Sequence, residues 1–497
     1  MNRKYDETNK ESIFQYAQKL KGQTFNEVCD QDKVFLQPDQ DPLIYKEEYK
    51  NKKRKGGLGE IIEERYFHYK IDNEARADFP KAELELKVTP YKINKNKTLS
   101  AKERLSISMI DYMKIIDTDF YDSNAWEKIK NILLIYYHAD SEIQDRLNYI
   151  VDYIYLYSPS EADLKIILHD YDTIQKKVLD GKAHELSEGD TIYLGAATKS
   201  SSSKQRTSQP CSSELAKPRA FSLKNSYMTY LLRNEIVPQA GQEEQQDKVI
   251  QDSDVTDFEA YVLGKINEYK GCRSGDLFKR FLAGEYKDSY SDYSRIAYAI
   301  LGVRTENAEE FEKASIVVKA IRIDVDNRGR NKIVESMSFP AFEIKELVEE
   351  EWETSETRQY FEETKFLFVL YQQDEDGYYL SGALFWNMPV SEIDGDLQKE
   401  WTRARDTFKR GVKFRLKEQK NGIFVHNDLP KGSNTNILHV RPHTGKSAYL
   451  IRELNYTKGN IERHGDQLPN GDFMTIQSFW LNNHYIFKQV KDYLSRS

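Results

Sequence analysis

The sequence predicts an α/β protein of two domains, in which the second domain is a degenerate copy of the first. Three observations lead to this prediction: the length of the chain, a polar segment near its centre, and motifs that recur in the same order on both sides of that segment. At 497 residues, the chain is well beyond the size at which one hydrophobic core usually divides. Its 39% of hydrophobic residues is enough to build packed cores.

The polar segment sets the predicted domain boundaries. Residues 238–256 are rich in Gln, Glu and Asp and poor in large apolar side chains. This composition is typical of an interdomain linker. We therefore predict an N-terminal domain over residues 1–237 and a C-terminal domain over residues 257–497.

Four pairs of similar segments predict an internal duplication. Each pair joins a segment of the first domain to one of the second, and the order is the same in both. The pairs are 13–22 with 258–271, 84–87 with 316–319, Trp126 and the apolar run after it with Trp352 and its apolar run, and 221–227 with 473–479.

The strand predicted over residues 84–87 carries the side chains that a phosphodiester hydrolase needs. Side chains alternate along a strand, so Glu85 and Lys87 project to one face, with Asp78 seven residues earlier. Two carboxylates can hold Mg²⁺, which prefers oxygen ligands. A lysine beside them can orient a water molecule and help to deprotonate it. A solvated strand face would show the same spacing, so the context of this motif decides between the two interpretations.

The copies differ where this chemistry would lie. Val317 stands at the position of Glu85, and the helix-like stretch 293–303 has no acidic residue. The corresponding stretch of the first copy carries Glu60, Glu63 and Glu64. The second domain is therefore predicted to be catalytically silent and to serve in binding or regulation.

Composition limits the partners and the compartment. A net charge of −8 argues weakly against nucleic acid, but a basic run at residues 50–55 directly precedes the predicted site. No apolar run approaches the roughly 20 residues of a membrane helix, and the N-terminus lacks a signal peptide. Three widely spaced cysteines indicate a reducing cytoplasm. Pro442, between His439 and His443, argues against a zinc site.

A longer series of motifs covers most of the first half and resembles a known family. In order, the motifs are Ala17-Gln18-x-Leu20-x-Gly22-x-Thr24, Lys55-Gly56-x-x-Gly59-x-x-x-Glu63, Asp78-Phe79 with Glu85-Leu86-Lys87, Lys128-Ile129-Lys130, Tyr193-Leu194 and Phe221-x-Leu223-Lys224. The series resembles MutH, the GATC-specific nicking endonuclease of mismatch repair. The whole chain resembles the GATC-cutting type II restriction endonucleases built as a doubled MutH, although its second half matches mainly in Val440-Arg441-Pro442 and in residues 473–487.

The resemblance implies a fold, an active site and a cofactor. The fold is the restriction-endonuclease core, a mixed sheet flanked by helices, in both domains. Asp78 and Glu85 are implied to bind Mg²⁺, with Glu63 as a further carboxylate near the metal. Lys87 is implied to position the attacking water, and Lys128 to contact a phosphate or a carboxylate. The implied products carry 5′-phosphates.

Two neighbours of Glu63 remain alternatives to it. Glu60 and Glu64 share roughly the same helix face. The preference for Glu63 rests on its spacing from Lys55.

The motif that would read the bases is split between the halves. The family places an Arg-Pro-Lys turn in the major groove, whereas this chain has Ala197-Thr198-Lys199 in one half and Arg441-Pro442-His443 in the other. One bidentate base contact contributes roughly 1–3 kcal/mol of discrimination, so the lost arginine must be replaced elsewhere. Either half could supply base contacts. The remaining predicted DNA contacts, mainly to phosphates, are Lys55, Lys204, Arg206, Arg219 and Lys224.

The resemblance leaves several functions to be separated by experiment. The leading hypothesis is a cytoplasmic, Mg²⁺-dependent type II restriction endonuclease of a restriction–modification system, cutting double-stranded DNA at GATC. The alternatives are a repair-type nicking endonuclease, a DNA-binding regulator without nuclease activity, and a nuclease of the same core with another target. One active site must also make two cuts, which suggests a dimer on DNA, sequential nicks, or a second DNA site in the C-terminal domain.

Overall fold

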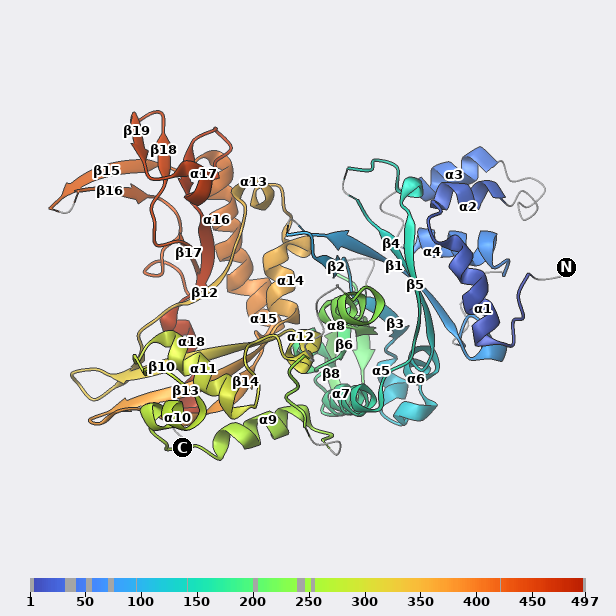
Figure 1. Ribbon diagram of the computed structural model, residues 1–497, viewed down its shortest axis with the longest axis horizontal. Helices are drawn as coiled ribbons and strands as arrows, with labels where there is room; N and C mark the ends of the chain where they lie inside the picture. Colours follow the sequence, from blue (N-terminus) through green and yellow to red (C-terminus); the bar gives the residue numbers. More distant parts are fainter. Residues whose placement is uncertain are drawn as a thin grey trace. The chain divides into compact units, whose positions relative to one another are not determined.

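The computed structural model describes residues 4–31, 42–50, 56–69, 76–94, 96–140, 142–199, 204–238, 246–251, 255–420 and 422–494. The chain forms two compact units (Figure 1). Unit 1 comprises Met1–Phe258 and Glu306–Ile316, and unit 2 comprises Glu259–Thr305 and Val317–Ser497. The segment 306–316 therefore belongs to unit 1, although it follows the predicted linker. The predicted DNA contact Lys55 lies outside the described residues.

Unit 1 is built around a mixed sheet. In the described part of the chain this sheet has four strands in the order β2-β1-β4-β5. The central pair, β1 (Glu85–Ile93) and β4 (Ile132–His138), is parallel. The outer strands, β2 (Leu99–Ala101) and β5 (Val151–Tyr157), are antiparallel to their neighbours. The residues of β4 from Ile132 to Tyr136 are fully buried, as expected for a central strand with both faces covered.

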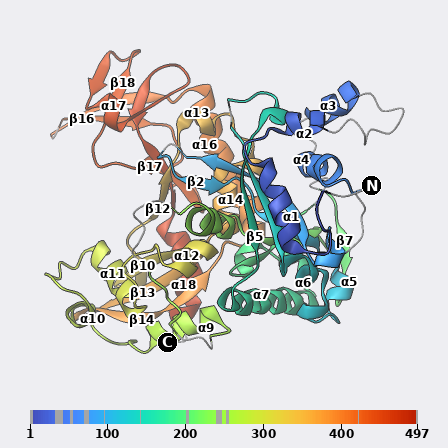
Figure 2. The same cartoon turned by 45° about the vertical axis from the view of Figure 1, so that its right-hand side comes forward.

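Helices cover both faces of this sheet (Figure 2). On one face α1 (Lys10–Ala17), α2 (Phe25–Gln31), α4 (Gly57–Ile61) and the π-helix η2 (Ile62–Tyr66) pack on Leu84, Leu86 and Leu133. On the other face lie α7 (Glu161–Leu179) and α8 (Asn225–Tyr230), and the Tyr136 hydroxyl on β4 donates to the Met228 carbonyl of α8. Side chains fix two helix starts, because Asn9 caps α1 and Ser160 caps α7.

A smaller sheet completes unit 1. Its strands are β3 (Leu105–Met109), β9 (Arg219–Leu223) and β6 (Leu194–Thr198), all antiparallel. The hairpin of β7 (Thr207–Gln209) and β8 (Ser212–Ala216) lies between β6 and β9 in the chain. The other elements of unit 1 are α3 (Pro42–Lys50), α5 (Tyr112–Ile115), α6 (Asn124–Ile129), α12 (Glu309–Ala314), and the short helices η1 (Gln18–Leu20), η3 (Pro80–Ala82), η4 (Phe120–Asp122), η5 (Arg146–Asn148), η6 (Ala183–Glu185), η7 (Glu188–Asp190) and η8 (Leu231–Ile236).

Unit 2 repeats this plan. Its described residues form a sheet in the order β11-β10-β13-β14 and a second sheet in the order β12-β22-β17. Trp401 and Phe408 of α16 and Ile486 and Val490 of α18 pack in one core with Phe368 of β13. The strands of unit 2 are β10 (Ile316–Val325), β11 (Asn331–Ile333), β12 (Met337–Ala341), β13 (Lys365–Asp374), β14 (Gly377–Trp386), β15 (Phe414–Gln419), β16 (Gly422–Asn427), β17 (Leu438–Pro442), β18 (Tyr449–Ile451), β19 (Tyr456–Lys458), β20 (Gly465–Gln467), β21 (Phe473–Thr475) and β22 (Gln477–Leu481). Its helices are α9 (Phe258–Asn267), α10 (Ser274–Phe281), α11 (Tyr290–Ile300), α13 (Ile344–Leu347), η9 (Trp352–Thr354), α14 (Glu356–Glu363), α15 (Val390–Glu392), η10 (Ile393–Leu397), α16 (Gln398–Arg410), α17 (Ile461–His464) and α18 (Asn483–Leu494).

The strand registers align the two copies residue by residue. Tyr91 pairs with Ala101 in the β1–β2 hairpin, and Ile323 pairs with Ile333 in the β10–β11 hairpin. Counting back from Tyr91 and Ile323 along β1 and β10 places Val317 at the position of Glu85. The same count places Lys319 at the position of Lys87. The predicted two-domain α/β fold with a degenerate second copy is therefore confirmed.

Two of the four sequence pairs were out of register. Leu194 pairs with Leu223 in β6–β9, and Leu438 pairs with Leu481 in β17–β22, so Phe221 corresponds to Phe479 and not to Phe473. Trp352 corresponds to Phe120, because each lies three residues before the serine that caps the next helix. Aromatic residues are frequent in this chain, so a comparison of short sequence segments cannot establish which aromatic residue of one copy corresponds to which of the other.

The register also assigns a counterpart to Asp78. It aligns Asp78-Phe79 with Glu310-Phe311, and the left-handed residue Glu83 (φ 49°) with the left-handed Ser315 (φ 55°). In unit 1 the Glu310 carboxylate accepts the backbone N–H groups of Val249 and Ile250 at 2.9 and 3.0 Å. The second copy has thus kept the loop before its first strand and uses its acid to hold the polar segment.

No helix among the described residues is both long and apolar enough to span a bilayer.

Candidate active site

Strand β1 brings the predicted acid and lysine together. Glu85 and Lys87 lie two residues apart on one face, and the Lys87 Nζ stands 2.6 Å from Glu85 Oε1. Lys128 Nζ, from α6, lies 3.0 Å from the same oxygen. Because α6 leads directly into β4, and Ile132 of β4 pairs with Glu85, the parallel pairing of β1 and β4 fixes this contact. The Glu85 side chain is only 1% exposed.

A tight loop carries Asp78 to the same place. Phe79 and Leu84 exchange backbone hydrogen bonds of 2.9 and 3.2 Å, which closes the loop through the left-handed residue Glu83. The Asp78 Oδ2 then accepts the backbone N–H of Leu86 at 2.8 Å. Because Leu86 lies between Glu85 and Lys87 on β1, this bond holds the Asp78 carboxylate beside these two residues.

Glu63 approaches from the helix that covers β1. It lies in the π-helix η2, a rare distortion that is frequent at functional sites. A Cβ placed on Gly59 would stand 3.9 Å from Glu63 Oε1 and from the Val88 side chain, an ordinary van der Waals distance, so α4 lies close over β1 at this point. Asp78, Lys87 and Glu85 all act on the Glu63 carboxyl electrostatically.

Two carboxyls of the site, those of Glu63 and Asp78, bind protons more tightly than usual. Burial, followed by repulsion from Asp78, raises the pKa of Glu63 to about 7. Burial and the charge of Glu85 raise the pKa of Asp78 to about 6, against the opposing effects of Lys87, the Leu86 N–H and Lys128. Burial is the main cause of both shifts and the crowded like charges add to it, and a bound cation would relieve the repulsion.

The donor set fits a hard divalent cation such as Mg²⁺. Carboxylate oxygens are the ligands that such ions prefer. The Oε2 of Glu85 is buried and has no hydrogen-bond partner among the described residues, so it is free to bind a metal. The described residues contain no group of three or more His, Cys, Asp or Glu placed to hold a metal by themselves. Mg²⁺ commonly uses one or two carboxylates and completes its shell with water and substrate phosphate.

Tyr69 was missed by sequence reasoning. Its backbone N–H donates to the Glu63 carbonyl, and its ring meets that of Phe79 edge-on at 5.4 Å. The hydroxyl is buried without a partner among the described residues. Burial, followed by the charges of Asp78, Glu63 and Glu85, raises the pKa of the phenol well above its ordinary value, which keeps it a proton donor. Only a lone tyrosine marks this position in the sequence.

Comparison with known proteins identifies the family of this chain. A family model described as "DNA mismatch repair enzyme MutH" matches residues 67–170, which include Asp78, Glu85, Lys87 and Lys128. The type II restriction enzyme Sau3AI of Staphylococcus aureus is 35% identical over 481 residues, which cover 89% of this chain and 94% of that enzyme. The chain belongs to the MutH-like type II restriction endonucleases.

In this MutH-like endonuclease the predicted DNA contacts of unit 1 fall into two groups. Lys199, Lys204 and Arg206 are exposed, as a phosphate or base contact requires. Arg219 and Lys224 are buried, and their side chains donate to the carbonyls of Ala196 and Thr191, both at 2.6 Å. The prediction that Arg219 and Lys224 contact phosphate does not agree with the structure, because both groups serve to hold the small sheet together.

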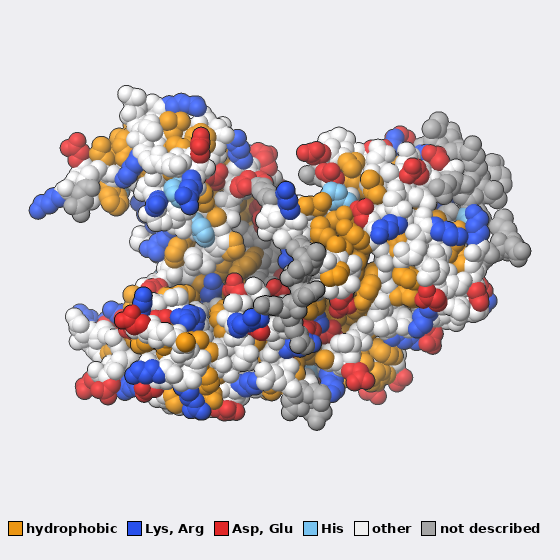
Figure 3. All heavy atoms as spheres, in the orientation of Figure 1, with side chains coloured by type: hydrophobic (Ala, Val, Ile, Leu, Met, Phe, Trp, Pro, Cys, Tyr) orange, Lys and Arg blue, Asp and Glu red, His pale blue; other side chains and the backbone are white. Residues whose placement is uncertain are grey.

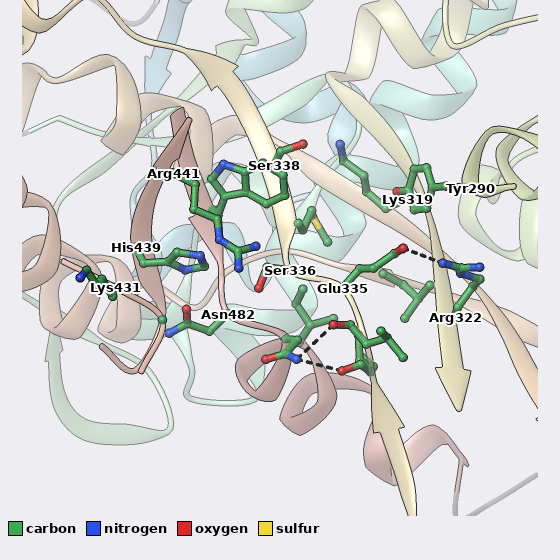
Figure 4. Close-up of a pocket in the computed structure, with 18 of the residues that line it drawn as sticks. Tyr290, Lys319, Arg322, Glu335, Ser336, Ser338, Lys431, His439, Arg441 and Asn482 are labelled. Carbon is green, nitrogen blue, oxygen red and sulfur yellow. Dashed lines mark hydrogen bonds and ion pairs between the residues drawn. The ribbon is translucent and has the colours of Figure 1, made fainter. Parts of the chain in front are cut away.

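Unit 2 of this MutH-like endonuclease has a pocket where the active site would lie. The pocket measures about 880 Å³ (Figure 4). Lys319 and Arg322 of β10 line one side, and His439 and Arg441 of β17 line another. Arg441 stacks on the Trp480 ring at 5.4 Å and is exposed, as is His443. Lys319 is the counterpart of Lys87, so this copy has kept a cation and lost the acid at Val317.

Proposed function

We propose that the protein is a Mg²⁺-dependent type II restriction endonuclease that hydrolyses double-stranded DNA at GATC and leaves 5′-phosphate ends. The observation that carries this proposal is the arrangement of Asp78, Glu85, Lys87 and Lys128 at the start of β1. The protein would act on DNA in the cytoplasm.

Each residue of the site has a distinct task in this proposal. Mg²⁺ would be held by Glu85 and Asp78, with Glu63 nearby, and would neutralise charge on the phosphate and acidify water. The Lys87 ammonium, fixed by Glu85, orients the attacking water and stabilises the charge that develops on it. Lys128 shares the Glu85 oxygen, so it is placed to contact a phosphate oxygen when DNA enters.

Unit 2 has the properties expected of a second DNA site. Its pocket carries the cations Lys319, Arg322, Lys431 and Arg441, and it has no counterpart of Glu85. One acid, Glu335, also lines the pocket and pairs with Arg322 at 2.5 Å. Burial and the neighbouring Arg441 lower the pKa of His439 to about 4, so this histidine is neutral at physiological pH. A neutral imidazole and the stacked Arg441 and Trp480 pair are suited to hydrogen-bonding and stacking, not to hydrolysis.

Digestion of a sequenced plasmid with the protein and Mg²⁺, followed by sequencing of the ends, tests the assignment. Linear fragments whose ends map to GATC support it. Nicked circles would favour the repair-type function instead, and ends at another sequence would replace the target while keeping the reaction.

Comparison of plasmids tests the role of unit 2. If unit 2 binds a second target, a plasmid with two sites should be cut faster than one with a single site at equal enzyme per site. A Lys319→Gln and Arg441→Gln variant should lose that difference. Equal rates on both plasmids for the unaltered protein would remove this role.

A further inference from the structure

An exposed β-ribbon extends from unit 2. Strands β15 and β16 pair only with each other and form an antiparallel two-stranded sheet. Phe414, at the base, packs edge-on against Tyr449 at a ring distance of 6.2 Å, and Val425 is half-buried against the core of the unit. Beyond these two anchors the ribbon projects away from the core (Figure 1).

The ribbon is an addition to the second copy. It lies between α16 and β17, whose counterparts in unit 1 are α7 and β6. Residues 180–193, which connect α7 to β6 and are all described, form only the short helices η6 and η7. The copy that lost Glu85 has therefore gained a projecting element that the catalytic copy lacks.

One face of the ribbon combines basic and aromatic side chains. The strand register places Lys417 opposite Phe424 and Arg415 opposite His426, all four on one face. The side chain of Phe424 is 58% exposed, so it is not part of the packed core of unit 2. Arg415 and Lys417 are both exposed. Figure 3 shows Lys and Arg side chains out to the end of this ribbon.

We propose that the Arg415–Phe424 face of the ribbon inserts into a groove of duplex DNA bound by unit 2. The inference rests on the proposed DNA-cleaving function, since it names how the same DNA is held. A two-stranded β-ribbon fits the major groove of B-DNA. Arg415 and Lys417 contact phosphates along the groove wall, and Phe424 contacts the bases or sugars between them. The positive charge complements the phosphates, and DNA contact explains why an exposed phenylalanine is tolerated.

Photo-crosslinking tests this placement directly. Phe424 is replaced by the photoreactive p-benzoylphenylalanine in the full chain carrying Glu85→Gln, which prevents cleavage. A labelled GATC duplex is the probe. Irradiation should join protein to DNA, whereas the same group at the exposed Lys491 on α18 should give no adduct. A protein–protein adduct would show that the face mediates self-association and would overturn the proposal, as would the absence of any adduct at 424.

The salt dependence of binding separates the roles of the side chains. The logarithm of the binding constant falls with the logarithm of salt concentration, and each lost phosphate contact makes this slope less steep by about 0.9. Arg415→Gln with Lys417→Gln should therefore reduce its magnitude by roughly 1.8. Phe424→Ala should weaken binding at least about five-fold without changing the slope. Lys491→Gln is the matched control. Unchanged affinity and slope in all variants would overturn the proposal.

Cleavage by the unaltered chain distinguishes failure of the ribbon proposal from failure of the proposed nuclease function. If that chain cuts GATC plasmid while the ribbon variants bind and crosslink like the controls, the ribbon proposal fails and the nuclease assignment stands. If the unaltered chain neither cuts nor binds duplex DNA, the proposed function itself fails.

Discussion

One carboxylate oxygen of Glu85 accepts hydrogen bonds from Lys87 and Lys128. The other oxygen has no partner among the described residues, which leaves it available for a metal ion. The meeting of Glu85 and Lys87 was predictable, because a period of two places i and i+2 side chains on one face of any strand. The approach of Lys128 and Glu63 followed only from the family resemblance, since it depends on β1–β4 pairing and on how η2 lies over β1. Arg219 and Lys224 were mispredicted because a basic residue looks alike in sequence whether it serves phosphate or a buried carbonyl.

Tyr69 was invisible to sequence reasoning, and a substitution tests its role. Tyr69→Phe keeps the ring contact with Phe79 and removes the buried hydroxyl on which the charges of Asp78, Glu63 and Glu85 act. This hydroxyl has no hydrogen-bond partner among the described residues, and we expect it to donate to a carboxylate once Mg²⁺ is bound. Such a bond contributes about 0.5–1.5 kcal/mol, so the Mg²⁺ concentration for half-maximal cleavage should rise roughly 2- to 12-fold. Calorimetric titration with Ca²⁺ should show a parallel loss of affinity. Tyr121→Phe, on an exposed ring of unit 1, is the control. If Tyr69→Phe matches the unaltered protein in both measurements, the hydroxyl has no part in positioning the carboxylates.

The crowded carboxyls predict how the metal-free protein responds to pH. The pKa of Glu63 rises from an ordinary 4.5 to about 7 on folding, and that of Asp78 from 3.8 to about 6. The resulting advantage of the folded state is complete below the unfolded pKa values and declines between the two values, where folding takes up protons. That advantage is lost as pH rises through the folded pKa, so the melting temperature in a chelator should fall from pH 5 to pH 8.

A variant isolates this contribution from the rest of the chain. Glu63→Gln with Asp78→Asn should be less affected by the same change in pH. Added Mg²⁺ should restore much of the stability of the unaltered protein at pH 8. A melting-temperature difference between variant and unaltered protein that does not change with pH would contradict the assignment.

At the scale of elements, the duplication could be foreseen but its register could not. The order of similar segments sufficed to predict two copies. Strand pairing was needed to match Phe221 with Phe479, and helix capping was needed to match Trp352 with Phe120. Helix α12 shows what such a comparison misses. It is the counterpart of η3 in the loop that carries Asp78, yet it packs in unit 1, where Lys313 Nζ contacts both oxygens of Asp163 at 2.9 Å.

Lys313 should therefore be important for the stability of unit 1. Burial alone would lower its pKa, but Asp163 and Glu309 outweigh this effect and hold its pKa above the ordinary value. Lys313→Met leaves the buried Asp163 without its cation and should cost about 3–5 kcal/mol in urea unfolding. The matched control is Lys248→Met, because Lys248 also pairs with Glu309 but is exposed, so its loss should cost under about 1 kcal/mol. Equal costs for the two variants would show that the Asp163 pair is unimportant.

At the scale of the whole molecule, two copies of one fold have diverged in chemistry. Unit 1 keeps Asp78, Glu85 and Lys87, whereas unit 2 has Glu310, Val317 and Lys319 at those positions. The acid of unit 2 holds a backbone segment, its lysine lines a cationic pocket, and its ribbon projects from the core. The division of labour was predictable from the loss of one acid. The ribbon was not predictable, because the sequence of two alternating strands does not show whether their faces pack on a core or are exposed to solvent.

The proposed active site depends on a single carboxylate, that of Glu85, and one substitution tests this most directly. Glu85→Gln changes one oxygen to an amide and keeps the size of the side chain. We expect it to lower the rate of GATC cleavage by at least about a thousand-fold, since it removes the central ligand of the site, while duplex DNA is bound nearly as well as by the unaltered protein. Cleavage that continues at a comparable rate would contradict a single active site on β1, and would direct the search for the catalytic centre elsewhere in the chain.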